Sequence, residues 1–78
     1  MATPSLSESA WAILMIFARK HICSGGTLPA GAVNDAFLTN PRFSPSDYDA
    51  GLKCALRKKW LAIDGESIRL TEVGFHEL

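Results

Sequence analysis

Residues 57–74 read RKKWLAIDGESIRLTEVG, and this stretch predicts a β-hairpin. The turn signal is Asp64-Gly65, a pair that favours a tight two-residue loop between antiparallel strands. Apolar residues alternate with other residues on both sides of this turn: Leu61, Ile63, Ile68 and Leu70. Because the side chains of a strand alternate between its two faces, we expect these four aliphatic residues to share one buried face.

Two strand registers are compatible with the turn. If Asp64 and Gly65 form a type I′ turn, Ile63 faces Glu66; if Gly65 and Glu66 form a type II′ turn, Ile63 faces Ile68. An isolated hairpin of this length is only marginally stable in water. The hairpin is therefore expected to pack against helices from the rest of the chain.

Three helices are expected before the hairpin, at about residues 6–22, 29–39 and 45–59. At the start of the first helix, Ser5 and Glu8 form a capping-box pattern in which each side chain bonds the backbone of the other. Helices followed by a hairpin predict an α+β fold.

The segments around these helices carry stop and start signals. Ser24-Gly25-Gly26 suits a left-handed C-cap for the first helix, and Thr27-Leu28 has room for a very short third strand. Ser44 and Pro45 suit the N-cap and the first position of the third helix. After the hairpin, Thr71 is a candidate N-cap for a terminal helix.

The first helix is apolar on nearly all sides. One face consists of residues at helical spacing: Trp11, Leu14, Met15, Ala18 and Ile22. Three further apolar residues fall mostly on the other side: Ile13, Ile16 and Phe17. Such a helix is either central in its domain or shares its surplus apolar face with a partner.

The third helix is expected to bury one side and expose the other. The buried stripe consists of Tyr48, Leu52, Ala55 and Leu56. The outward side consists of Ser46, Asp47, Ala50, Lys53, Cys54, Arg57 and Lys58. Gly51 lies at the edge of the stripe, where we expect it to permit close approach of the second helix. Lys59 points back toward the stripe, so its aliphatic stem is expected to pack there.

Composition and charge limit the possible partners. The chain has 78 residues, 47% apolar and 21% charged, which is typical of one globular domain. We expect residues 1–4 to be disordered and residues 5–78 to form that domain. Eight basic residues balance eight acidic ones, so attraction to phosphate must come from local clusters of charge. The longest apolar run, residues 10–18, is too short for a bilayer span, so we expect a cytoplasmic protein without a membrane partner.

Neither a metal nor another cofactor is expected. Cys23 and Cys54 have no neighbouring cysteine, so free thiols are the default, and a zinc site built from them with His21 and His76 has no recognisable ligand spacing. The sequence also lacks a phosphate-binding glycine loop and a nucleophile with a histidine nearby, so we do not expect an enzyme.

The order of the expected elements resembles the winged helix-turn-helix superfamily over about residues 6–78. The resemblance rests on LPAGAV at 28–33, on GLKCALRKKWLAIDGESIRL at 51–70, and on Leu70-Thr71-Glu72-x-Gly74, which is similar to the LT-x-x-G ending of many bacterial wing hairpins. It implies an α+β domain with three helices, a short hairpin wing and the start of a fourth helix. One departure is the loop at 40–44, which is longer and richer in proline than the turn of a standard helix-turn-helix.

This resemblance implies a DNA-binding domain of the transcription-regulator type, whose third helix, at about residues 45–59, enters the major groove. The implied contacts with double-stranded DNA are Arg42, Ser46, Asp47, Lys53, Arg57, Lys58 and Arg69. Within this set, Lys53 and Arg57 would donate to guanine and Asp47 would accept from cytosine. A solvated helix face explains Lys53, Arg57 and Lys58 equally well.

The hairpin tip, Asp64-Gly65-Glu66, carries two carboxylates that repel phosphate, so the wing is expected to contribute little to DNA binding. A monomer would bind weakly, and a homodimer formed through the first or the terminal helix would bind more tightly.

The alternative is a protein-interaction module docked in a larger assembly. Zero net charge, the acidic tip and the surplus apolar face of the first helix suit this role. Ile13, Ile16 and Phe17 would then form the interface.

Overall fold

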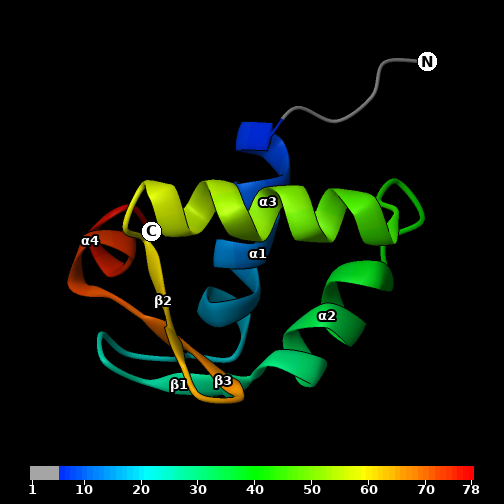
Figure 1. Ribbon diagram of the computed structural model, residues 1–78. Helices are drawn as coiled ribbons and strands as arrows, with labels where there is room; N and C mark the ends of the chain where they lie inside the picture. Colours follow the sequence, from blue (N-terminus) through cyan, green and yellow to red (C-terminus); the bar gives the residue numbers. More distant parts are fainter. Residues whose placement is uncertain (1–5) are drawn as a thin grey trace.

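The computed structural model describes residues 6–78 (Figure 1). Their elements are, in order, α1 (Leu6–Arg19), β1 (Thr27–Pro29), α2 (Ala30–Leu38), α3 (Pro45–Arg57), β2 (Leu61–Asp64), β3 (Ser67–Leu70) and α4 (Glu72–His76). Over this range the chain is an α+β domain with four helices and a three-stranded antiparallel sheet. The disorder expected at residues 1–4 and the cap expected at Ser5 lie outside the described residues.

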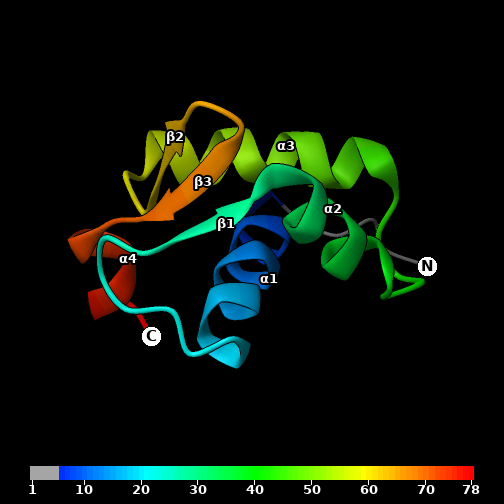
Figure 2. The same ribbon diagram turned by 90° about the horizontal axis from the view of Figure 1, so that it is seen from below.

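Figures 1 and 2 show α3 crossing over α1, with α2 near the N-terminal end of α3 and the hairpin and α4 near its C-terminal end. α3 therefore lies at the surface of the molecule, with α1 behind it. Among residues 6–78, no other helix or strand lies on the outer side of α3.

The sheet has the strand order β1-β3-β2. Leu28 pairs with Ile68, which confirms the expected third strand. In the hairpin, Ile63 pairs with Ile68. The register is thus the one expected for a Gly65-Glu66 loop, and the positive φ of Gly65, 64°, agrees with a type II′ turn.

Three of the four hairpin aliphatics are buried, but Ile63 is not. Leu61, Ile68 and Leu70 are at most 2% exposed, whereas Ile63 is 55% exposed. The expectation that Ile63 is core is wrong because β2 is the outer strand and Ile63 lies near the turn. Ile68 lies on the central strand β3, where its side chain packs in the core cluster with residues of the helices.

The core side of α1 is centred on Ile13 and Phe17 and includes Leu14 from the face that carries Trp11. Ile13 and Phe17 are fully buried and Ile16 is 6% exposed, whereas Trp11 is 40% exposed. These three aliphatic and aromatic side chains pack with residues of α2, α3 and the hairpin: Val33, Phe37, Ala55, Leu61, Ile68 and Leu70. Ile13, Ile16 and Phe17 are therefore part of the core, so the first helix is central in the domain, and the alternative in which these three residues form an interface is wrong.

The helix ends are formed by non-glycine residues. α1 stops at Arg19, three residues earlier than expected, and His21 takes a left-handed conformation with φ 57°. The Ile22 N–H donates to the Phe17 carbonyl at 3.0 Å, and the His21 N–H donates to the Ala18 carbonyl at 3.0 Å, which is a Schellman motif. The C-cap predicted at Gly25-Gly26 is therefore wrong.

Gly51 is a contact point between helices, although the partner differs from the expected one. A Cβ atom built at Gly51 would lie 2.6 Å from Ser9 Cβ and 2.8 Å from the Ser9 carbonyl carbon. Ser9 belongs to α1, so the glycine permits close approach of α1 and not of α2.

The Leu70-Thr71-Glu72-x-Gly74 pattern has a structural cause. Thr71 is the N-cap of α4, as expected, and its Oγ1 accepts a hydrogen bond from the Gly74 N–H at 3.1 Å. The same hydroxyl contacts the Trp60 carbonyl at 2.8 Å. A Cβ at Gly74 would lie 2.2 Å from that carbonyl oxygen, so only glycine lets α4 begin against the start of the hairpin.

Candidate nucleic-acid interface

The start of α3 is fixed by a complete capping box. Ser44 Oγ accepts from the Asp47 N–H at 3.3 Å, and Asp47 Oδ2 accepts from the Ser44 N–H at 2.9 Å. Asp47 Oδ2 also accepts from the Ser44 hydroxyl at 3.1 Å. The carboxylate of Asp47 therefore caps its own helix. If it accepted a hydrogen bond from cytosine instead, the cap would be lost.

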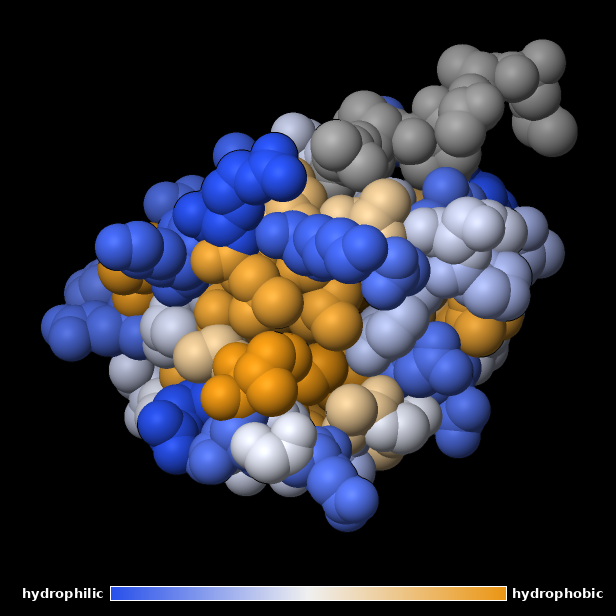
Figure 3. Space-filling model, in the orientation of Figure 1, coloured by the Kyte–Doolittle hydropathy of each residue, from blue (hydrophilic) through white to orange (hydrophobic). Residues whose placement is uncertain are grey.

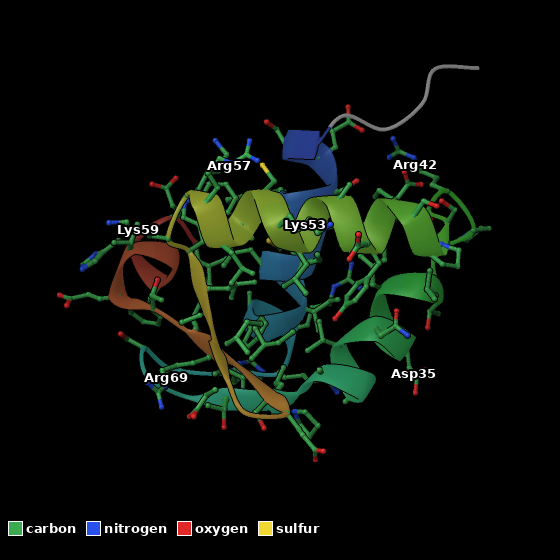
Figure 4. The ribbon with its side chains drawn as sticks, in the orientation of Figure 1. Asp35, Arg42, Lys53, Arg57, Lys59 and Arg69 are labelled. Carbon is green, nitrogen blue, oxygen red and sulfur yellow. The ribbon has the colours of Figure 1, made fainter. Side chains whose placement is uncertain are left out.

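The outward side of α3 carries a stripe of small and basic side chains. It consists of Ser46, Ala50, Lys53 and Arg57, which share one face because they are spaced by four, three and four residues. Figure 4 shows Lys53 and Arg57 projecting from α3 away from α1. Between these two side chains, over Ala50 and Cys54, the surface has a shallow depression of about 170 Å³.

Three of the expected cations are paired with carboxylates. Arg42 bonds Glu8 at 3.1 Å, and Lys53 bonds Asp49 at 3.2 Å. Arg69 bonds Asp64 across the hairpin. All of these side chains are about half exposed or more, and such surface pairs stabilise a protein by about 0–1 kcal/mol. A phosphate group can therefore replace the carboxylate at little cost.

Two clusters of cations have no carboxylate partner within residues 6–78. One is Arg57-Lys58-Lys59 at the C-terminal end of α3, where Lys58 Nζ lies 5.3 Å above the Trp60 ring. The other is Arg19-Lys20 at the end of α1. Lys59 is exposed and its backbone is left-handed with φ 64°, so its stem does not pack on the apolar stripe as expected.

The predicted phosphate contacts do not lie side by side. Figure 4 places Arg42 at the N-terminal end of α3, Arg57 at the other end and Arg69 on the sheet. The positive charge therefore follows α3 and does not extend onto the hairpin. At the hairpin tip Arg69 neutralises Asp64, and the Glu66 carboxylate remains exposed.

A hydrophobic surface lies beside this stripe. Figure 3 shows hydrophobic side chains gathered where α3 meets the hairpin, in the orientation of Figure 1. The partly exposed leucine and isoleucine side chains of these two elements are Leu52, Leu56 and Ile63. Sequence periodicity placed all three in the core, so it missed this surface.

The remaining chemistry of the described part of the chain is limited. Cys23 and Cys54 are free thiols. No group of three or more His, Cys, Asp or Glu side chains within residues 6–78 is arranged to hold a metal ion. Within the same range, no helix has the length and apolar character needed to cross a bilayer.

Comparisons of the chain with family models, with curated proteins and with solved structures find no match.

Proposed function

We propose that the chain is a winged helix-turn-helix domain that binds double-stranded DNA through α3, with the hairpin as a wing that contributes little. The element order, in which α3 is followed by a hairpin and a short capped helix, supports the family. The function rests on the surface position of α3 and its exposed basic side.

The observation that carries the proposal is the stripe of Ser46, Ala50, Lys53 and Arg57. Small side chains near the helix start let the backbone approach base edges, and the basic side chains farther along supply donors for guanine or phosphate. Nothing else in residues 6–78 covers this side of α3 (Figure 4).

The basic residues on α3 and just before it set the expected salt dependence of DNA binding. Arg42, Lys53, Arg57 and Lys58 give four candidate phosphate contacts, so the logarithm of affinity should fall with the logarithm of salt concentration at a slope of about −4. A threefold increase in salt should therefore weaken binding by about 80-fold. Arg69 is left out because the acidic tip lies beside it.

The test is a titration of labelled duplex DNA, followed by fluorescence anisotropy at low salt and at threefold higher salt. The double variant Lys53→Gln/Arg57→Gln should lose about tenfold or more in affinity, because each position supplies a charge to the same face. Its matched control is Arg19→Gln/Lys20→Gln, which removes the same charge from the end of α1 and should bind more tightly than the α3 variant. No binding at micromolar protein at either salt would contradict the proposal.

A second candidate function is protein docking through the hydrophobic surface of Leu52, Leu56 and Ile63. The observation that favours it is the 55% exposure of Ile63 on β2, an edge strand that pairs with β3 on one side only among residues 6–78. In the titration above, absence of DNA binding by a protein whose size grows with concentration would favour docking.

A further inference from the structure

An aromatic depression lies next to the N-terminal end of α3, and Arg42 is the one residue of its lining that the proposed contacts with duplex DNA use. Its volume is about 320 Å³, which is at the lower end of the range of small-molecule sites. It is lined by Glu8, Trp11, Ala12, Asn40, Arg42 and Phe43. Arg42 and Phe43 directly precede Ser44, the N-cap of α3. We call this depression the aromatic slot.

Two aromatic side chains of the slot, Trp11 and Phe43, each pack against another aromatic ring. Trp11 makes an edge-to-face contact with Trp60, with ring centroids 5.9 Å apart. Phe43 packs on Phe37, with centroids 4.5 Å apart. Trp11 is nevertheless 40% exposed, so a large part of its ring is free to stack on a ligand. Planar rings with a fixed orientation favour a planar ligand.

The polar groups of the slot are also oriented. The backbone N–H of Arg42 donates to Asn40 Oδ1 at 3.0 Å, which fixes the orientation of the Asn40 side-chain amide. The NH₂ group of this amide has no partner within residues 6–78. The Arg42 guanidinium lies 5.7 Å from the centre of the Phe43 ring and bonds Glu8 at 3.1 Å. The slot thus offers amide donors and a cation beside the exposed ring of Trp11.

We propose that the aromatic slot binds one unpaired nucleotide. Trp11 stacks on the base, the Asn40 amide bonds its polar edge, and Arg42 binds its phosphate, while Phe43 lines the side of the slot. A base pair inside a duplex has both faces covered by its neighbours, so the ligand is a nucleotide outside a duplex. The inference rests on the proposed DNA binding, because a strand that contacts the start of α3 lies beside Arg42 and Phe43.

The two tryptophans of the chain make a direct test possible. In the Trp60→Phe variant Trp11 is the only tryptophan, so the emission of the whole protein reports on the slot. We expect a short single-stranded DNA to quench this emission, and a blunt duplex to bind by anisotropy with little quenching. A deoxynucleoside monophosphate is the third ligand: quenching as tight as that of the strand identifies free nucleotides as the source, and weaker quenching identifies a strand.

Matched variants separate the slot from the rest of the surface. In the Trp60→Phe background, Asn40→Ala and Phe43→Leu should each weaken the quenching by about tenfold. Phe75→Leu is the control, because Phe75 is 43% exposed, about as much as Trp11, but lies on α4 outside the slot. Thermal unfolding of each variant shows that the fold is retained, and Asn40→Ala keeps the test valid if Phe43→Leu unfolds.

The outcomes for the slot and for the proposed function are distinct. If neither the strand nor the monophosphate changes Trp11 emission at low salt while the duplex still binds, the slot proposal is overturned and the function of α3 stands. If the duplex fails as well, both proposals are overturned. Quenching that Asn40→Ala and Phe75→Leu weaken equally would also overturn the slot.

Discussion

At the scale of single residues, two glycines determine how closely the elements approach. A Cβ at Gly51 would collide with Ser9 of α1, and a Cβ at Gly74 would collide with the Trp60 carbonyl. Neither glycine has a positive φ, so their role is steric and not conformational. The sequence marked both positions, Gly51 as a close approach and Gly74 by the LT-x-x-G pattern, but the contacted residue became known only from the fold.

Replacing Gly51 by alanine should destabilise the domain by about 1–3 kcal/mol, because α1 and α3 must separate to admit the methyl group. This loss exceeds the gain of about 1 kcal/mol in helix propensity. Gly31→Ala is the matched control, since Gly31 also lies in a helix but has no heavy atom within 4 Å of its added Cβ. Urea unfolding should show a stabilised Gly31→Ala and a destabilised Gly51→Ala; equal stabilities would contradict the contact with Ser9.

At the scale of elements, both long helices end in the same motif. At the end of α3, the Trp60 N–H donates to the Ala55 carbonyl at 3.0 Å and the Lys59 N–H donates to the Leu56 carbonyl at 3.1 Å. Lys59 takes the left-handed position of this Schellman motif, where glycine is the preferred residue. The motif turns the chain from α3 directly into the hairpin, so the local strain at Lys59 helps to place the hairpin beside α3.

Lys59→Gly should therefore raise the free energy of unfolding, by up to about 1 kcal/mol, because glycine adopts a positive φ without steric cost. Lys59→Ala is the control: it removes the same exposed side chain but keeps the Cβ, and should not stabilise. The two variants are compared by urea unfolding. A gain for Lys59→Ala as large as that for Lys59→Gly would assign the effect to charge and contradict the backbone explanation.

At the scale of the whole molecule, Tyr48 links α3 to α2. Its ring lies 5.4 Å from that of Phe37, and its hydroxyl donates to the Ala30 carbonyl at 3.5 Å, which is a long hydrogen bond. Burial raises the pKa of Tyr48 above its ordinary value of 10.0. The protonated phenol is thus favoured by the fold, and the packing of α2 on α3 depends on it.

The pH dependence of stability follows from the raised pKa of Tyr48. The folded state holds the Tyr48 proton more tightly than the unfolded state, so this contribution to stability is complete below pH 10.0 and is lost as the pH rises through the raised pKa. Tyr48 is the only tyrosine, so tyrosinate absorbance reports on it alone. We expect a titration midpoint above 10.0 in the folded protein and a lower midpoint in urea. Equal midpoints would contradict burial of the phenol, and Tyr48→Phe provides the baseline.

Sequence patterns alone determined the order of elements, the third strand, the N-cap of α3 and the cap of α4, because caps, turns and hydrophobic periodicity are local properties of the chain. They also identified the outward side of α3, since helical spacing sets which residues share a face. Local patterns could not decide which apolar face of α1 becomes the core. Ile13 and Phe17 are buried and Trp11 is exposed only because α2, α3 and the hairpin all pack on one side of α1.

The ion pairs of Arg42 and Arg69, the exposure of Ile63 and the aromatic slot likewise come from the tertiary structure. Each depends on side chains brought together from distant parts of the chain, such as Glu8 with Arg42, or on the position of a strand at the edge of the sheet. Spacing along a single helix or strand carries no information about such contacts. For this reason the basic side of α3 was visible in the sequence, whereas the aromatic slot beside its N-terminal end was decided by the fold.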